Sequence, residues 1–336
     1  MLTWARQRNH VLPSVAGIAG GITSVYVFYV FGWALGFVTS FIAMVVLYLE
    51  IMTQLSFRAP TKRKEPLNDP EWKRFDINAN GYDVVHYVRQ GRVGQPIAWV
   101  CHGWTSGAIR MTHRASSFVE RGWSVVLVDL PSHGGSAALP KWSAEESSSL
   151  LINAMNHLCQ QQPDLFGADV YYYGHSIGAF IGLRISKRRE ELTQEAHPKA
   201  WIFESPMTGY TEIHHETCNL LKIPTAIRPL ILKNILRHFN AINGPNRAVS
   251  SLSDADVPTW GLPAEPTLMV QANPDERLGS VHHLRLIEAM SDSGRMNHLD
   301  AHFLDDLRHS GSHESDSRKT VIDAWLDEQD NHSSSV

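Results

Sequence analysis

Residues 170–178 read Val-Tyr-Tyr-Tyr-Gly-His-Ser-Ile-Gly and decide the fold. The apolar run up to Tyr173 predicts a strand, and the run that starts at Ile177 predicts a helix. Between them lies Gly174-His175-Ser176-Ile177-Gly178, a G-x-S-x-G sequence in the strand, turn and helix context that a nucleophile elbow requires. The serine stands at a helix N-terminus, where the helix dipole favours a developing anion. Ser176 is therefore the candidate nucleophile.

Outward from this elbow, short apolar runs bounded by Gly and Pro alternate with helical patterns, as in a mostly parallel sheet covered by helices on both faces. We expect strands at residues 83–89, 97–101, 124–130, 170–173, 200–203, 267–270 and 301–305. We expect helices at residues 110–121, 143–160, 177–188, near 280–290 and at 316–328. The soluble part is thus predicted to be an α/β domain.

Two further motifs carry a resemblance to a known family. His102-Gly103-Trp104 ends the strand Ile-Ala-Trp-Val-Cys, and a D-x-P-x-H-G-x-S stretch runs from Asp129 to Ser136. With the elbow, they make residues 75–328 resemble the α/β-hydrolase superfamily, and bacterial serine esterases and lipases within it. The resemblance implies an α/β-hydrolase fold.

The resemblance also implies an oxyanion hole and a set of structural residues. In such enzymes two backbone N–H groups bind the oxyanion, and here they belong to Trp104 and Ile177. We interpret His102, Asp129 and His133 as structural.

An acidic residue after the strand at 267–270 completes the pattern of a catalytic triad. Val270-Gln271-Ala272-Asn273-Pro274-Asp275 resembles the V-x-G-x-x-D stretch of the family, with Ala272 in place of its glycine. Asp275 is therefore the candidate acid, and Glu276 is its neighbouring rival.

The base is expected to be a histidine after the last strand, because the triad of this fold follows the chain order Ser, Asp, His. Two histidines compete for the role. His309 precedes Leu326 of the terminal helix by 17 residues, a spacing like that of many family members, whereas Ser312-His313-Glu314 resembles the G-H-E variants. We choose His309 and keep His313 as the alternative.

The N-terminal segment is apolar enough for lipid. No charged residue occurs from Val11 to Leu49, and a helix of these 39 residues would be about 58 Å long, nearly twice the thickness of a bilayer core. Two helices joined near the aromatic cluster around Gly32 fit better than one tilted helix, which remains the alternative. We expect residues 1–56 to be a membrane anchor of one or two transmembrane helices.

Basic residues flank both ends of the apolar run, with Arg6 and Arg8 before it and Arg58 and Lys62 to Lys64 after it. The positive-inside rule then predicts an anchor in the inner or cell membrane, with the catalytic domain facing the cytoplasm. Residues 57–72 are rich in Pro and charge and are expected to be a linker.

We place the α/β-hydrolase domain at residues 73–330. About 60 residues after Glu204 do not follow the alternation of strand and helix, so we expect a helical cap at about 207–264, and an ordinary crossover with a long surface excursion is the alternative. The tail at residues 331–336 is expected to be disordered.

Composition excludes several classes of function. Lys+Arg 30 against Asp+Glu 34 gives a formal charge of −4 without long blocks of one sign, so nucleic acid is not an expected partner. The wide spacing of the three cysteines argues against a disulfide framework and against a zinc site. The doublets His214-His215 and His282-His283 point about 100° apart on a helix and are poor chelating pairs. We expect no cofactor and no metal.

The expected function is hydrolysis of a carboxylic ester, and of a lipid-like acyl ester in particular, through Ser176, His309 and Asp275. An acyltransferase, a thioesterase or a peptidase would use the same triad, and a catalytically inactive hydrolase fold that binds a partner is a further alternative.

Overall fold

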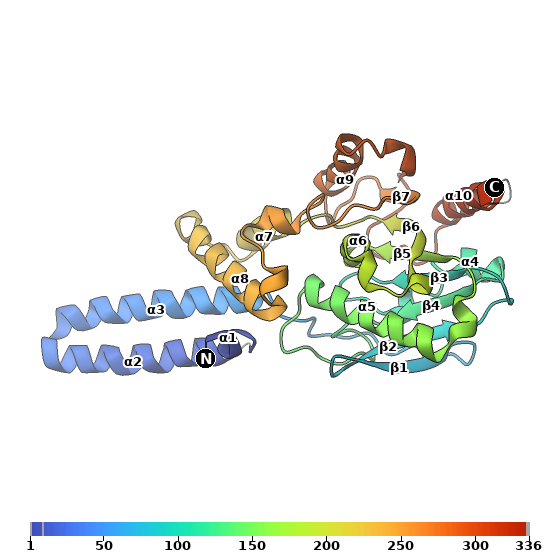
Figure 1. Cartoon of the computed structure of the whole chain (residues 1–336). Coiled ribbons are helices and arrows are strands. Elements are labelled where there is room, and N and C mark those ends of the chain that lie inside the picture. The colour runs from blue at the N-terminus through green and yellow to red at the C-terminus, as the bar shows by residue number, and fades with distance from the viewer. Residues whose placement is uncertain (1, 9, 334–336) are drawn as a thin grey trace. The chain divides into compact units, whose positions relative to one another are not determined.

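The computed structural model of the chain describes residues 2–8 and 10–333, and contacts divide it into two compact units (Figure 1). One unit consists of Met1–Ala59, Leu139–Glu146 and Tyr210–Asp254. The other consists of Pro60–Ala138, Ser147–Gly209 and Ala255–Val336 and contains the whole β-sheet. The helices expected as anchor and those expected as cap thus belong to one unit, which we call the helical unit, and the sheet belongs to the hydrolase unit.

The elements of the chain have the following bounds. The strands are β1 Lys73–Ala79, β2 Tyr82–Arg89, β3 Ile97–Cys101, β4 Ser124–Val128, β5 Val170–His175, β6 Pro198–Glu204, β7 Thr267–Ala272 and β8 Leu299–Leu304. The α-helices are α1 Leu2–Arg6, α2 Val11–Phe31, α3 Trp33–Leu55, α4 Ser116–Glu120, α5 Ala144–Gln161, α6 Ile177–Lys187, α7 Tyr210–Leu220, α8 Arg228–Asn243, α9 Ser280–Asp292 and α10 Asp316–Ser333.

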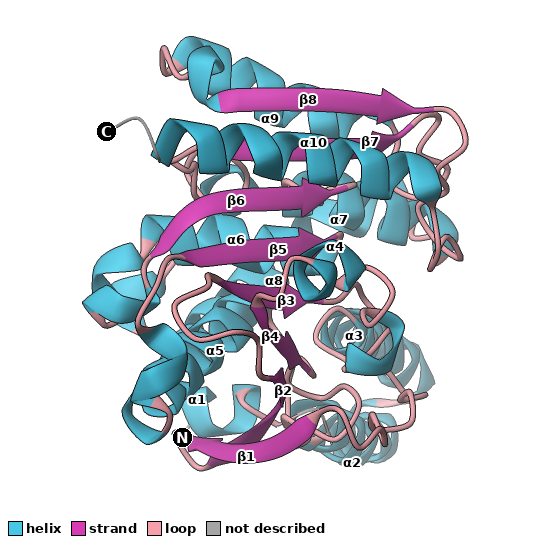
Figure 2. Ribbon diagram, turned by 90° about the vertical axis from the view of Figure 1, so that its right-hand side faces the viewer, coloured by secondary structure: helices cyan, strands magenta, loops and turns pink. Residues whose placement is uncertain are grey.

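The hydrolase unit is built on an eight-stranded sheet of order β1-β2-β4-β3-β5-β6-β7-β8. The pairs β1/β2 and β2/β4 are antiparallel, and every other pair is parallel. Helices α4 and α10 cover one face, and α5, α6 and α9 cover the other (Figure 2). The predicted α/β-hydrolase fold is confirmed.

The three consecutive tyrosines of β5 show why a strand that is covered on both faces is apolar throughout. Tyr171 packs on Trp123 at 4.7 Å between ring centroids, on the face under α4 and α10. Tyr172 points to the opposite face and meets Trp99 edge to face at 5.1 Å, while Tyr173 returns to the first face. The alternating side chains of β5 thus pack against aromatic residues on both faces of the sheet. This packing holds the strand in place directly before the turn that contains Ser176.

Two predicted elements differ from the structure. The helix expected at 110–121 is only a 3-10 turn at Ala108–Arg110 and the short α4. The Ala108 N–H donates to the Asp129 carboxylate at 2.7 Å, which fixes a separate turn there, and the intervening residues include Thr112 and His113, which are weak helix formers. Strand β1 was not predicted, because four of its seven residues are polar or charged: Lys73, Arg74, Asp76 and Asn78.

The expectation of a disordered tail is wrong for residues 331–333, because α10 continues through Ser333. No Gly or Pro interrupts the chain between Asp316 and that residue, so nothing in the sequence ends the helix earlier. Residues 334–336 lie outside the described part of the chain.

In the helical unit, α2 and α3 form an antiparallel pair that turns at Gly32, whose φ of +88° favours glycine. A side chain at Gly20 would lie 2.8 Å from the Ala43 Cβ, so the small residue lets the two helices approach closely. Both helices are long and apolar enough to cross a membrane, and most of their surface is exposed in the chain by itself. The apolar run is therefore two helices rather than one.

Candidate active site

The elbow between β5 and α6 holds Ser176 in a strained conformation. Its φ of +54° and ψ of −114° are unusual for a residue with a side chain, and its N–H donates to the Glu204 carbonyl of the neighbouring strand at 3.0 Å. Any side chain at Gly174 would lie 2.6 Å from the Ala179 Cα, and one at Gly178 would lie 2.6 Å from the Cys101 carbonyl oxygen. Both glycines are thus required for the turn that lifts the serine hydroxyl.

The structure brings three of the sequence-predicted site residues together. The His309 Nε2 is 3.0 Å from the Ser176 Oγ, and the His309 Nδ1 is 2.9 Å from the Asp275 Oδ2. Ser176 follows β5, Asp275 follows β7, and His309 follows β8, so all three lie at the carboxyl end of the parallel strands. All three side chains are buried.

The hydrogen bonds around Asp275 fix its charge. Its Oδ1 accepts the N–H groups of Arg277 at 2.9 Å and Leu278 at 2.8 Å, and its Oδ2 accepts the Gln271 amide at 3.0 Å. Burial by itself would raise the pKa of the carboxyl, but the hydrogen bond and charge of His309 and these N–H donors outweigh burial and lower it to about 2. The residue is a carboxylate at neutral pH.

This carboxylate determines the tautomer of His309. It can only accept, so the Nδ1 of the imidazole carries the proton and donates it to Asp275. The Nε2 of a neutral ring is then an acceptor that faces the Ser176 hydroxyl. This arrangement can remove the serine proton as the oxygen attacks an electrophile.

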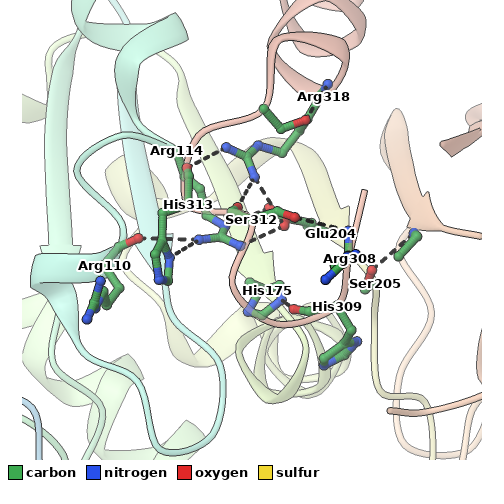
Figure 3. Close-up of polar contacts among 12 residues, drawn as sticks. Arg110, Arg114, His175, Glu204, Ser205, Arg308, His309, Ser312, His313 and Arg318 are labelled. Carbon is green, nitrogen blue, oxygen red and sulfur yellow. Dashed lines mark hydrogen bonds and ion pairs between the residues drawn. The ribbon is translucent and has the colours of Figure 1, made fainter. Parts of the chain in front are cut away.

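The two rival residues lie elsewhere. Glu276 is exposed, and the adjacent Asp275 meets the imidazole instead. The His313 Nδ1 lies 3.4 Å from a guanidinium nitrogen of Arg114 (Figure 3). Burial and the positive charges of Arg114 and Arg110 lower the pKa of His313. The structure therefore does not bring this histidine to Ser176.

His175 at the elbow holds the loop that carries His309. Burial, with the positive charge of Arg114, lowers the pKa of His175 to about 3, so the ring is neutral at pH 7. Its Nε2 is 3.0 Å from the His309 carbonyl oxygen, and because a carbonyl only accepts, the proton must lie on this nitrogen (Figure 3). His175, the residue before the nucleophile, thus holds the backbone of His309 in place.

A buried ionic cluster fixes the same loop from the other side. The Glu204 carboxylate, at the end of β6, accepts two hydrogen bonds from Arg114, each of 2.9 Å (Figure 3). It also accepts a hydrogen bond from the Tyr173 hydroxyl and a longer one, of 3.4 Å, from Arg318. Burial would raise the pKa of Glu204, but the two guanidinium groups hold it well below its ordinary value. Arg318 also donates to the Ser312 and His313 carbonyl oxygens, both at 2.8 Å. The cluster therefore connects β6 and α10 to the loop of His309.

Sequence reasoning did not identify this cluster. An acidic residue at the end of the apolar strand Ala-Trp-Ile-Phe-Glu was the one available signal, because a buried carboxylate needs a cation. Nothing in the sequence marks Arg114 or Arg318 as its partner, since they are 90 and 114 residues away from Glu204.

The backbone predicted to form the oxyanion hole lies beside the serine. A Cβ added to Gly103 would be 3.4 Å from the Ser176 Cβ, so the turn that precedes Trp104 passes directly over the nucleophile. Ile177 opens α6, and the first N–H groups of a helix have no acceptor inside the helix. The loop that leads to Trp104 and the first turn of α6 therefore both lie beside the Ser176 side chain.

The three residues interpreted as structural make internal contacts. The His102 Nε2 accepts the Leu130 N–H at 3.0 Å, so its Nδ1 carries the proton and donates it to the Gly103 carbonyl at 2.7 Å. Burial lowers the pKa of His102 to about 4, which keeps this tautomer neutral. Asp129 accepts the Gly135 N–H at 2.8 Å. His133 packs against the Trp104 ring at 5.2 Å between centroids. These contacts shape the loops around the serine.

Within the described residues, no group of three His, Cys, Asp or Glu side chains could hold a metal ion. The three cysteines are free and buried. Of the histidine doublets, His282 is buried in α9, where its Nδ1 accepts the Thr208 N–H at 3.0 Å.

Comparisons with known proteins agree with this fold. Residues 95–256 match the family model described as serine aminopeptidase, S33. No curated protein matches the sequence. An esterase of Pyrococcus furiosus superposes with a TM-score of 0.58 at 13% identity, over 81% of this chain and 97% of the esterase.

Two other solved structures are similar in fold. Est1E of Butyrivibrio proteoclasticus, solved with ferulic acid bound, has a TM-score of 0.54 at 16% identity over 75% of this chain and 98% of its own. An acylaminoacyl peptidase of Pyrococcus horikoshii has a TM-score of 0.51 at 13% identity over 78% of this chain and 42% of its own. The sheet order, the elbow and these similarities together show that the chain has the α/β-hydrolase fold.

Proposed function

We propose that the chain is a membrane-anchored serine hydrolase that cleaves carboxylic esters through an acyl-enzyme. The observation that supports this most directly is the continuous hydrogen-bonded series Ser176, His309, Asp275, with distances of 3.0 and 2.9 Å. A hydroxyl, an imidazole and a buried carboxylate in this order are the arrangement that activates a serine for acyl transfer.

In the acylation step, the Ser176 Oγ attacks the ester carbonyl carbon as the His309 Nε2 takes the hydroxyl proton. The carbonyl oxygen becomes an oxyanion, which the N–H groups of Trp104 and Ile177 bind. Each such donor contributes about 10²–10³ to the rate. The tetrahedral intermediate then collapses, the C–O bond to the alcohol breaks, and the imidazolium returns its proton to the leaving alkoxide.

In the deacylation step, water replaces the alcohol. The neutral His309 removes a proton from the water as its oxygen attacks the acyl carbon, and the same two N–H groups bind the second oxyanion. Collapse releases the carboxylic acid and returns the proton to the Ser176 oxygen. Asp275 stays ionised throughout, stabilises the imidazolium and keeps the ring oriented.

The proposed substrate is a lipid-like acyl ester. Two helices with the length and apolarity to span a bilayer precede the hydrolase unit, so the enzyme would work where such esters are concentrated. A peptide or aminoacyl amide is the second candidate, because the matching family model is described as a serine aminopeptidase. The basic flanks of the apolar helices support a catalytic unit on the cytoplasmic side.

The central test is covalent labelling with a fluorophosphonate, which reacts with an activated serine. The wild-type chain is expected to be labelled, and Ser176→Ala is expected to lose the label and at least about 10³-fold in ester hydrolysis while it folds normally. A wild-type protein that is neither labelled nor active, or a Ser176→Ala variant with full activity, would contradict the proposal.

The substrate class is tested with matched p-nitrophenyl esters of increasing acyl length and with aminoacyl p-nitroanilides. Highest kcat/KM on the longer esters is expected, whereas preference for the anilides would move the function to a peptidase. Product analysis with and without an added alcohol separates hydrolysis from acyl transfer, since a transferase would form the new ester instead of the free acid.

A further inference from the structure

The connection between α7 and α8 has an unusual composition. Residues 220–237 read Leu-Leu-Lys-Ile-Pro-Thr-Ala-Ile-Arg-Pro-Leu-Ile-Leu-Lys-Asn-Ile-Leu-Arg, in which every charged side chain is basic. We call residues 220–233 the α7–α8 tip. Lys222, Arg228 and Lys233 give it positive charge.

Large apolar side chains of this tip are exposed beside its basic groups. Leu220 is 82% exposed, Leu230 52% and Leu221 37%. Removing apolar surface from water is favourable by about 25 cal/mol for each Å². A partner that covers these leucines would therefore be bound more tightly. Leucines interspersed with Lys and Arg are the composition of segments that lie in the interface of an anionic bilayer.

Contacts inside the helical unit fix the direction of α8 along α3. Asn234 donates to the Glu50 carboxylate at 2.8 Å, and one turn later His238 stacks on Phe57 at 6.1 Å between ring centroids. Increasing residue number in α8 therefore follows increasing residue number in α3. At the far end of α8, the Gln7 amide donates to the Ala241 carbonyl at 3.2 Å.

The level of the bilayer surface on α3 follows from its sequence. Glu50 is the first charged residue after the apolar run, so the membrane boundary of a spanning α3 lies near it. Leu230 precedes Asn234 by four residues, or about 6 Å of helix. Because α8 and α3 run in the same direction, Leu230 lies toward the apolar residues that precede Glu50 in α3. In a bilayer that α3 spans, the start of α8, which Figure 1 shows next to α3 in the helical unit, would lie at the depth of the lipid headgroups and upper acyl chains.

We propose that the α7–α8 tip is a second membrane contact, which inserts its leucines into the same bilayer that holds α2 and α3 and binds anionic phospholipids through Lys222, Arg228 and Lys233. This inference rests on the membrane anchoring in the proposed function. It assigns the excursion after β6 to the lipid surface, from which an acyl ester substrate would come.

The test uses the full-length chain in lipid nanodiscs with an environment-sensitive fluorophore on Leu230→Cys or Leu220→Cys. The three native cysteines are buried, so the introduced thiol is the selective target. Val93→Cys, at a residue that is 97% exposed in the hydrolase unit, is the matched control, and Ile22→Cys in α2 reports whether the anchor itself is in lipid.

In nanodiscs with anionic phospholipid, the probes at positions 220 and 230 are expected to shift their emission to shorter wavelength. We expect nitroxide-labelled lipids to quench them and aqueous iodide to quench them little, while the probe at 93 behaves in the opposite way. The double variant Lys222→Gln/Lys233→Gln is expected to weaken quenching by lipid, and more so as the anionic fraction rises.

Each of the other outcomes would refute a specific part of the inference. If the probe at Ile22 is in lipid but that at Leu230 is quenched by iodide as strongly as that at Val93, the tip does not touch the membrane and the anchor stands. Shielding of the Leu230 probe from both quenchers would mean that a protein covers the tip. A probe at Ile22 that is open to iodide would refute the anchor and this inference together, while fluorophosphonate labelling of Ser176 would still test the hydrolase chemistry.

Discussion

Replacement of Arg318 by methionine tests whether the ionic cluster positions the catalytic histidine. Arg318 is 2% exposed and donates to the Ser312 and His313 carbonyl oxygens, both at 2.8 Å, three and four residues after His309. Methionine keeps the apolar stem and removes the guanidinium. The loop then loses the two hydrogen bonds from Arg318, while the hydrogen bond from Ser317 to Asp306 and the one from His175 to the His309 carbonyl remain.

The magnitude follows from the groups that lose a partner. A hydrogen bond from a charged donor contributes about 1.5–3 kcal/mol, and removing one partner of a buried ion pair costs about 3–5 kcal/mol. Arg114 still pairs with Glu204 through two hydrogen bonds, so that carboxylate keeps a cation. We expect Arg318→Met to lower the free energy of unfolding by about 3–5 kcal/mol. That loss leaves a folded protein if the total lies in the upper part of the usual range of about 5–15 kcal/mol.

The catalytic effect comes from the position of the imidazole. Misplacement of a reacting group by about 1 Å can reduce the rate by about 10²-fold. We therefore expect Arg318→Met to lower kcat and the rate of fluorophosphonate labelling by about 10²-fold, with KM nearly unchanged, because the cluster contacts the loop and not the substrate. Arg318→Lys, which retains a charge but lacks the planar fork, is expected to recover part of the rate.

The assay is kcat and labelling rate on protein shown to be folded by circular dichroism and urea unfolding. Arg188→Met is the control, because Arg188 is also buried in the hydrolase unit and binds Glu191 and Ser149, which lie outside the His309 loop. That variant is expected to lose stability and keep its turnover. A folded Arg318→Met with wild-type kcat, or an equal loss in both variants, would refute the reasoning.

Three further predictions follow from the site. His309→Ala is expected to abolish turnover and fluorophosphonate labelling while His313→Ala keeps most of both; the reverse result would move the base to His313, and two active variants would reject the triad. Because His309 and backbone N–H groups lower the pKa of Asp275 from 3.8 to about 2, its contribution to stability is complete above pH 3.8 and is lost as the pH falls toward 2. Urea unfolding of wild type and Asp275→Asn across this range measures it, and parallel curves would contradict the assignment. Gly178→Ala is expected to impair folding, since its Cβ would lie 2.6 Å from the Cys101 carbonyl oxygen, and a variant with wild-type unfolding free energy and activity would show that this contact can relax.

The sequence alone determined the features that depend on local pattern. The elbow could be recognised because a G-x-S-x-G between an apolar strand and a helix is a contiguous signal, and the structure explains its glycines by contacts with Ala179 and Cys101. The alternation of strands and helices, and the two apolar helices joined at Gly32, were predictable for the same reason. Asp275 was identified as a candidate because residues 270–275 resemble the V-x-G-x-x-D stretch that follows this strand in the family.

Only the tertiary structure decided which distant residues meet. His309 and His313 are four residues apart in one loop, and local sequence could not say which imidazole faces Ser176. That depends on contacts from Arg318 of α10, His175 of the elbow and, through Glu204, the end of β6. Likewise, the packing of α8 on α3 through Glu50 joins residues 184 positions apart. Such long-range pairs have no signature in local periodicity, because they are selected by the packing of the whole chain.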